Sequence, residues 1–246
     1  MTEARSLDAD ALHVWRASLD VTPSLLAMLE ATLSTEERAR AARFVRIADG
    51  ARYVAAHAFL RDILGRYLER RPESLRFRSG PFGKPELDRE GKGASAATAL
   101  QFSLSHADGL ALVALTRGRR VGVDLERVEP ALAEGRIPEH FLSPHEVAEL
   151  RALPVDQQLD AFFACWTRKE AYVKARGDGM SLRFDSFDVT LTPGIPAALL
   201  HAPGDPNEAG RWTLWTLVVA PGYAGAVAVE GQAWPPDINA WEPDQP

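Results

Sequence analysis

The sequence contains one cysteine, Cys165, and this scarcity excludes two common ways of stabilising a fold. A single thiol forms no internal disulfide, and it has no cysteine partner for a zinc site of the cysteine-pair type. Long hydrophobic runs are also missing, because no stretch approaches the roughly 18 to 20 apolar residues of a membrane span. The first residues have neither the basic nor the apolar segment of a secretory signal. We therefore expect a cytoplasmic chain.

Several catalytic motifs are absent as well. There is no GxxxxGK[ST] loop, no GxGxxG after a strand, no HExxH and no GxSxG, so the chemistries that depend on them have no support. The net charge of -6 argues against a general nucleic-acid binder. Between Glu36 and Lys84, however, twelve Lys or Arg residues stand against six Asp or Glu. The first half can therefore hold an anion, and arginines that only solvate helix faces are the alternative.

The predicted elements follow each other in the same order twice. Hydrophobic periodicity and two capping boxes, at Ser34 and Ser143, define them. In the first half we expect a strand at 11–20, helices within 22–46 and 50–69, a strand at 74–79 and a hairpin at 100–116. In the second half we expect a strand at 119–128, a helix at 156–176, a strand at 181–191 and a hairpin at 212–230.

Short sequence matches support a duplication. The letters SLRF occur twice at an offset of 107 residues, the LSxxE boxes at 109 and the hairpin turns at 113. A slowly drifting offset is typical of a repeated unit with small insertions. We expect an α+β fold of two similar subdomains, at 1–118 and 119–232, with a ligand cleft between them. The Pro-rich end at 233–246 is expected to be an extended tail that continues neither sheet nor helix.

One carboxylate of the predicted helix at 156–176 lies on its apolar face. At about 100° per residue, Glu170 falls within the apolar stripe of this helix. The stripe consists of Leu159, Phe162, Phe163, Trp166 and Val173. Burying a carboxylate without a cation costs several kcal/mol as an order of magnitude. Lys174, at the edge of the stripe, supplies part of the compensation, and a metal ion is a candidate for the rest.

Two further carboxylates stand on the predicted strand at 119–128. Alternation puts Gly122, Asp124 and Glu126 on one face and three apolar residues on the other. A half-exposed strand with a wet acidic face would explain this pattern, but the apolar strands on either side indicate an inner position. Two carboxylates on a strand and one on a helix are ligands that Mg²⁺ prefers, with water and phosphate in the remaining positions. Asp124, Glu126 and Glu170 are therefore predicted to form a phosphate-handling metal site.

Three more polar residues lie next to turns in the first half. Ser105 and His106 end the strand FSLSH, where a hydroxyl and an imidazole reach a cleft. Lys84 lies in the turn FGKP. For each of the three, a purely structural or solvated role is the alternative, and none is specific alone.

Together these segments resemble a known family. FGKP, FSLSH, VGVDLE and FFACWTRKEAYVKARGDGMSL are similar to the 4'-phosphopantetheinyl transferases, in particular the monomeric type that activates surfactin synthetase. The signature motifs of that family are a G-[VI]-D-x-E strand and a W-[STC]-x-K-E-[AS]-x-x-K helix, matched here at 122–126 and 166–174. The resemblance covers about residues 33 to 190. It implies a pseudodimer of two α+β halves with coenzyme A in the cleft between them.

The resemblance also implies roles in catalysis. Asp124, Glu126 and Glu170 would bind Mg²⁺, with Mn²⁺ as an alternative ion, and Glu170 would also be the base for the incoming hydroxyl. Lys174 would contact the pyrophosphate, so Glu170, Lys174 and Asp124 form the expected catalytic set.

Further residues would bind coenzyme A. Ser105 and His106 resemble contacts to its phosphates, and Lys84 resembles a lysine at the adenine end. The residues that look like holders of the 3'-phosphate are Arg40, Arg52 and, as a third, Arg43. Glu37 is a departure, because relatives often have a lysine there and the capping box occupies this glutamate instead.

The activity implied is that of a holo-[acyl-carrier-protein] synthase. It transfers 4'-phosphopantetheine from coenzyme A to a serine of an apo acyl or peptidyl carrier protein and releases 3',5'-ADP. A cytoplasmic monomer that binds neither nucleic acid nor membrane is expected. One alternative is another Mg²⁺-dependent phosphotransferase or pyrophosphatase, which would not need the FSLSH and GKP segments. A non-catalytic coenzyme A binding protein is the other, and loss of one of the three carboxylates would mark it.

Overall fold

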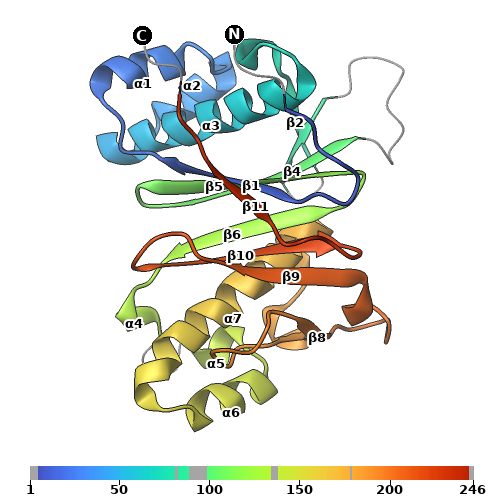
Figure 1. Ribbon diagram of the computed structural model, residues 1–246. Coiled ribbons are helices and arrows are strands. Elements are labelled where there is room, and N and C mark those ends of the chain that lie inside the picture. The colour runs from blue at the N-terminus through green and yellow to red at the C-terminus, as the bar shows by residue number, and fades with distance from the viewer. Residues whose placement is uncertain (1–4, 81–82, 89–98, 134–137, 178, 244–246) are drawn as a thin grey trace.

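Two β-sheets form the middle of the molecule, and helices cover the outer face of each (Figure 1). The computed structural model describes residues 5–80, 83–88, 99–133, 138–177 and 179–243. One sheet has the strand order β11-β1-β5-β4 and the other has the order β6-β10-β9. The expected α+β class is confirmed.

The order of elements agrees with most of the sequence predictions. In the first half they are β1 (His13–Ser18), α1 (Pro23–Glu30), α2 (Thr35–Ala41), α3 (Ile47–Leu68), β2 (Phe77–Ser79), β3 (Pro85–Leu87), β4 (Leu100–Ala107) and β5 (Leu110–Arg117). From residue 121 onward they are β6 (Val121–Arg127), α4 (Pro130–Ala133), α5 (Pro138–Phe141), α6 (Pro144–Ala152), α7 (Val155–Arg176), β7 (Asp188–Val189), β8 (Leu199–His201), β9 (Trp212–Leu217), β10 (Tyr223–Glu230) and β11 (Asp237–Ala240). Both capping boxes are confirmed, at Ser34 and Ser143. In the described ranges no helix has the length and apolar character needed to cross a membrane.

A layer of apolar side chains joins the inner faces of the two sheets. Val121, Val123 and Leu125 of β6 belong to this layer, together with residues of β1, β5, β9 and β10. The alternation predicted for this strand is confirmed, because Gly122 and Asp124 point the other way, toward α7. The outer faces of the two sheets pack against α3 and α7 in two separate cores.

The strand predicted at 181–191 is wrong for most of its length. The chain forms a short 3₁₀ turn at Phe184–Ser186, and only Asp188–Val189 pairs with β8. The carbonyl oxygens of Phe184 and Phe187 accept hydrogen bonds from the ammonium group of the buried Lys169. Because these carbonyl groups point toward Lys169, they are not directed at a neighbouring strand, and a regular β-ladder does not form here.

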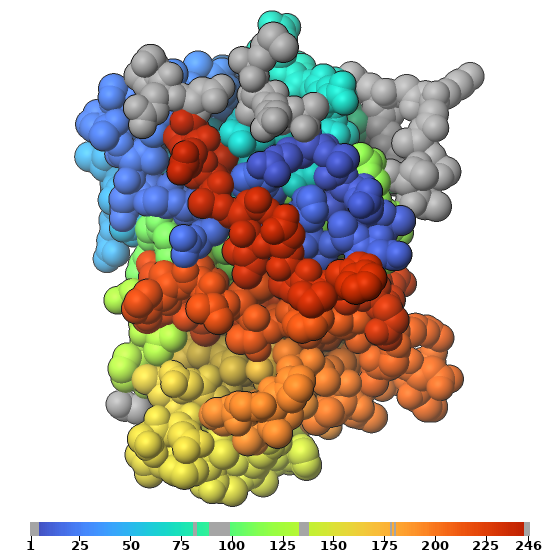
Figure 2. Space-filling model, in the orientation of Figure 1, coloured from blue at the N-terminus to red at the C-terminus, as the bar shows by residue number. Residues whose placement is uncertain are grey.

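The expectation that the extended tail at 233–246 continues no sheet is also wrong. Asp237–Ala240 forms β11, which pairs with β1 in parallel. The prolines of this segment lie outside the four paired residues, so they remove no hydrogen bond from the ladder. Trp241 follows the strand, is buried, and packs on Phe59 of α3. Figure 2 shows this C-terminal segment lying across the surface of the first half.

Candidate active site

Gly122 lets helix α7 lie directly against strand β6. A Cβ atom at Gly122 would be 2.1 Å from the carbonyl oxygen of Ala171 and 2.3 Å from the amide nitrogen of Ala175. Both are backbone atoms of α7, so only a residue without Cβ permits this approach. Asp124 and Glu126 follow on the same face of β6 and therefore meet the side chains of the same helix.

We expect Gly122→Ala to destabilise the fold by roughly 1 to 3 kcal/mol, because the helix must move away from the strand. Urea unfolding measures this change. Gly210→Ala is the matched control, since a Cβ there would have no atom within 4 Å. If the two alanine variants were equally stable, the close contact at Gly122 would not constrain α7.

Asp124 is buried and lies at the centre of a small polar network. Lys174 of α7 places its Nζ 2.6 Å from Asp124 Oδ1 and 3.0 Å from Ser105 Oγ. The Ser105 hydroxyl donates to the same carboxylate oxygen at 3.1 Å. Burial alone would lower the pKa of Lys174, but the ion pair with Asp124 outweighs burial and raises it. Lys174 therefore stays protonated and holds one oxygen of Asp124 in place.

The other oxygen of Asp124 faces no donor. Oδ2 is buried and has no hydrogen-bond partner among the described residues. A buried carboxylate oxygen without a partner is costly, so such atoms in native proteins call for an explanation such as an ion.

Glu126 and Glu170 lie within electrostatic reach of Asp124. Burial, and next the charge of Asp124, raise the pKa of Glu126 to about 7. The same two causes raise the pKa of Glu170. Trp166 of α7 donates its Nε1–H to Glu126 Oε1 at 3.2 Å and thereby orients that carboxylate. Because the charge of Asp124 disfavours the ionised forms of Glu126 and Glu170, a cation beside the three side chains would be stabilising.

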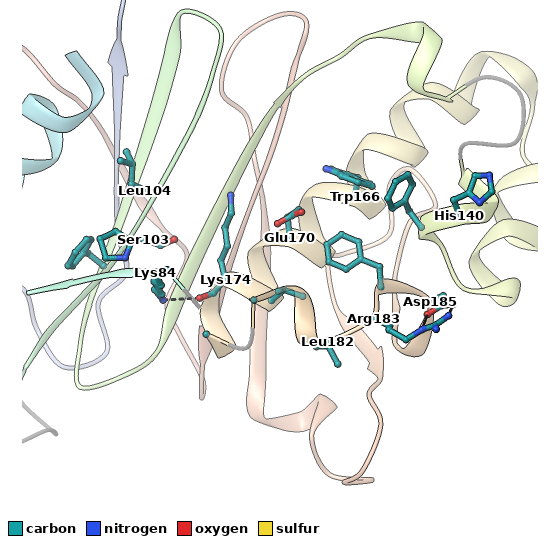
Figure 3. Close-up of a pocket in the computed structure, with 18 residues that line it drawn as sticks. Lys84, Ser103, Leu104, His140, Trp166, Glu170, Lys174, Leu182, Arg183 and Asp185 are labelled. Atoms are coloured by element: carbon teal, nitrogen blue, oxygen red, sulfur yellow. Dashed lines mark hydrogen bonds and ion pairs between the residues drawn. The ribbon is translucent and has the colours of Figure 1, made fainter. Parts of the chain in front are cut away.

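A pocket of about 650 Å³ opens beside this network. In Figure 3, Lys84, Ser103 and Lys174 lie at one end, Glu170 lies in the middle, and Trp166 lies toward the other end. The pocket lining also includes four large apolar side chains, Phe141, Trp166, Leu182 and Phe184. Beyond Glu170, Figure 3 also shows the polar residues His140, Arg183 and Asp185. Glu170 therefore stands between an end that carries two lysines and is suited to phosphates, and an end of mixed aromatic and polar lining.

The donor set fits Mg²⁺ without forming a complete cage. In the part of the chain that the structure describes, no three His, Cys, Asp or Glu side chains gather in a group that could hold a metal ion. Mg²⁺ does not require such a cage, because it usually takes one or two carboxylates and completes its shell with water and substrate phosphates. The unpartnered oxygen of Asp124, with Glu126 and Glu170 near it, is a donor set of this kind.

The motif FSLSH connects the two sheets at their edges. Val123 and Leu125 of β6 donate their backbone N–H groups to Ser103 Oγ and Ser105 Oγ of β4, at 3.1 and 3.3 Å. Serines two residues apart on one strand face the same way, so they satisfy successive free donors of the neighbouring edge. His106 lies on the opposite face and is exposed.

Lys84 ties its turn to both signature elements. Its Nζ donates to the carbonyl oxygens of Val121 on β6 and Lys174 on α7, each at 2.8 Å. Burial lowers the pKa of Lys84 to about 8. The structure thus places Lys84 at the polar end of the pocket.

The three arginines expected at the 3'-phosphate differ in their surroundings. Arg52 pairs with Asp20 at 2.8 Å and with Asp108 at 3.7 Å, so two carboxylates already share its charge. Arg40 is exposed, and its guanidinium lies 5.5 Å from the ring centroid of Tyr53. Arg43 is exposed as well.

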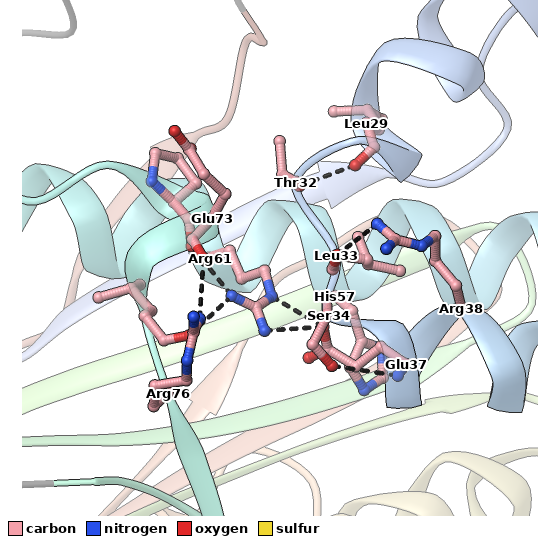
Figure 4. Close-up of polar contacts among 12 residues, drawn as sticks. Leu29, Thr32, Leu33, Ser34, Glu37, Arg38, His57, Arg61, Glu73 and Arg76 are labelled. Atoms are coloured by element: carbon pink, nitrogen blue, oxygen red, sulfur yellow. Dashed lines mark hydrogen bonds and ion pairs between the residues drawn. The ribbon is translucent and has the colours of Figure 1, made fainter.

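One carboxylate oxygen of Glu37 is held by contacts inside the first half. Its carboxylate accepts from the backbone N–H of Ser34 at 2.8 Å and pairs with the buried Arg61 at 2.8 Å (Figure 4). Arg61 also donates to the carbonyl oxygens of Pro72 and Leu75. A glutamate at this position therefore stabilises the packing of α2 on α3.

Sequence reasoning missed a buried ion pair next to the site. Lys169 Nζ lies 2.7 Å from Glu146 Oε2, and both side chains are 0% exposed. Glu146 also accepts from the backbone N–H groups of Ser143 and Val189, at 2.9 Å each. The spacing in the sequence could have revealed this pair. Lys169 follows Trp166 by three positions, so it lies on the same, core-facing side of the helix as the apolar stripe and needs a buried partner for its charge.

Comparison with known proteins agrees with this geometry. Residues 15–117 match the N-terminal family of 4'-phosphopantetheinyl transferases, and residues 120–228 match the 4'-phosphopantetheinyl transferase superfamily. The 4'-phosphopantetheinyl transferase HetI of Nostoc is 40% identical over 94% of this chain and 92% of its own length. Sfp of Bacillus subtilis is 28% identical over 84% of this chain and 86% of its own.

Among solved structures, the holo-[acyl-carrier-protein] synthase of Thermotoga maritima matches 46% of this chain and 63% of its own, with 22% identity and a TM-score of 0.36. The two family matches together span both halves of the molecule, and the Nostoc relative aligns along nearly all of it. The chain belongs to the 4'-phosphopantetheinyl transferase family.

Proposed function

We propose that the chain transfers 4'-phosphopantetheine from coenzyme A to a serine hydroxyl of an apo acyl or peptidyl carrier protein, with release of 3',5'-ADP. The observation that carries this proposal is the buried, unpartnered oxygen of Asp124, which lies beside two carboxylates with raised pKa at the junction of the two halves. Membership of the family supports the substrates.

Asp124, Glu126 and Glu170 are the residues that would hold Mg²⁺, or Mn²⁺ in its place. When bound, the ion neutralises charge that develops on the pyrophosphate during transfer. Asp124 is prepared for this role because Lys174 and Ser105 fix its Oδ1 and leave Oδ2 free. Trp166 does the same for Glu126 by donating to one of its oxygens.

Glu170 accepts the proton of the attacking serine in this proposal. The serine oxygen forms a bond to the β-phosphorus, and the bond from that phosphorus to the bridging oxygen breaks, so 3',5'-ADP leaves. A general base of this kind contributes roughly 10² to 10⁴ in rate. Burial and the charge of Asp124 raise the pKa of Glu170, which makes it a stronger base than an exposed glutamate.

The remaining predicted residues bind coenzyme A. Lys174 faces the pyrophosphate from the polar end of the pocket, with Ser105 and Lys84 beside it. His106 contacts a phosphate from the exposed side of β4. For the 3'-phosphate we retain Arg40, Arg43 and Arg52.

We further propose a cytoplasmic monomer that takes carrier proteins as partners and binds no nucleic acid. Ser105 and Asp124 come from different halves of one chain, so the network needs no second copy to be complete. Cys165 is a buried free thiol, which suits a reducing compartment.

The test is incubation with coenzyme A, Mg²⁺ and an apo carrier protein, followed by intact-mass measurement of the carrier. We expect the carrier to gain one phosphopantetheine, and we expect EDTA to prevent the gain. Carriers of the fatty acid, polyketide and nonribosomal peptide classes are tried in parallel. A set of carriers that all remain in the apo form would overturn the proposal.

A further inference from the structure

His57 on α3 has a fixed ring with one free nitrogen. Its ring stacks on Tyr53 with centroids 3.8 Å apart, and its Nδ1 lies 3.0 Å from the carbonyl oxygen of Tyr53. A carbonyl oxygen only accepts, so Nδ1 carries the hydrogen and donates it. Nε2 has no hydrogen-bond partner in the described part of the chain. The half-buried ring therefore presents Nε2 in a defined direction.

Arg40 lies beside this pair of rings, and His106 is within electrostatic reach of His57. The guanidinium of Arg40 lies over the ring of Tyr53, which stacks on His57. Burial is the main cause that lowers the pKa of His57 to about 4, and the charges of His106 and Arg40 lower it further. Glu37 acts in the opposite direction, but Arg61 already pairs with its carboxylate.

The charge balance of this group favours a doubly charged anion. Arg52, one of the arginines expected to hold phosphate, is paired with Asp20 and Asp108. Arg40 is exposed. The His106 ring reaches solvent but is partly desolvated by its surroundings, and this desolvation, followed by the charges of Lys174 and Arg40, lowers its pKa. Arg40 is permanently charged, and the His57 and His106 imidazoles can each gain a proton beside an anion. Together they can balance the two negative charges of a phosphate monoester.

We propose that His57, with Arg40 and His106, binds the 3'-phosphate of coenzyme A and makes the site selective for that phosphate over a free 3'-hydroxyl. The identity of the ligand rests on the proposed function. On binding, Nε2 of His57 takes up a proton from water and donates it to a phosphate oxygen. The bond from Nδ1 to Tyr53 keeps the ring aimed during this step. Position 57 lies outside both signature motifs, which occupy residues 122–126 and 166–174.

The test is calorimetric titration of the whole protein with coenzyme A and, separately, with 3'-dephospho-coenzyme A. His57→Phe keeps the ring that stacks on Tyr53 and removes the nitrogen. We expect it to weaken binding of coenzyme A roughly tenfold, as for loss of one hydrogen bond to a charged group, and to leave binding of the dephospho form unchanged. His57→Gln, a second variant with a smaller side chain, should give a smaller loss of the same selectivity. His201→Phe, an exposed position on β8, is the control.

Equal weakening of both ligands, or of neither, would overturn the assignment of His57. Thermal unfolding of each variant shows whether it folds normally. If His57→Phe does not, the affinities of His57→Gln for coenzyme A and for 3'-dephospho-coenzyme A are compared instead. No carrier protein is present in these titrations. A wild-type protein that binds coenzyme A with selectivity dependent on His57, yet modifies no carrier, would therefore support the anion site and overturn the transfer reaction instead.

Discussion

Glu170→Gln should reduce transfer of phosphopantetheine by a factor of 10² or more, as expected for removal of a base worth roughly 10² to 10⁴. The substitution keeps the volume and one carbonyl oxygen of the side chain, but it removes the charge and the ability to accept a proton. It also removes a carboxylate whose ionised form is disfavoured by burial and by Asp124, so the fold should be no less stable. Intact-mass measurement of the carrier over time gives the rate.

Glu30→Gln is the matched control, because Glu30 is an exposed glutamate on α1 in the other half of the molecule. It should transfer at the wild-type rate. A Glu170→Gln protein with near-normal turnover would exclude Glu170 both as a base and as a metal ligand. Titration of each variant with coenzyme A separates loss of chemistry from loss of substrate binding, since we expect affinity to change much less than rate.

Lys169→Met should lower the free energy of unfolding by roughly 3 to 5 kcal/mol, the usual consequence of leaving one partner of a buried ion pair without compensation. Lys169 and Glu146 are both fully buried, so no water reaches the remaining carboxylate. The carbonyl oxygens of Phe184 and Phe187 lose their donor in the same variant. Urea unfolding measures the change.

The double variant Lys169→Met with Glu146→Gln should recover part of this loss. Glutamine carries no charge to bury and keeps one acceptor oxygen, which can serve the backbone N–H of either Ser143 or Val189 but not both, so the recovery is only partial. Arg78→Met is the control, because its pair with Glu86 is exposed and such pairs contribute about 0 to 1 kcal/mol. A single Lys169→Met variant no less stable than Arg78→Met would show that the buried pair does not hold the 184–187 turn in place.

The elements with a strong local signal were predictable from the sequence. A long helix with an apolar stripe, a capping box and an alternating strand each depend on neighbours within a few residues, so the elements that carry Glu170 and Asp124 were predicted correctly. The strand at 181–191 failed because a lysine twelve or more positions away takes its carbonyl groups, and no local pattern contains that contact. The same holds for the pairing of Lys174 with Asp124, which joins residues 50 positions apart, where the sequence had suggested Glu170 as the partner.

Strand β11 has a consequence for how the protein is made. The sheet that contains the first strand of the chain is completed by residues 237–240, and Trp241 then covers Phe59 and donates to Asp62 on α3. During synthesis one edge of β1 therefore stays open, and part of α3 stays uncovered, until residues 237–241 have left the ribosome. Such an exposed edge is a site for pairing with other chains. We expect chains shortened before residue 237 to aggregate, although they retain every residue of the proposed active site.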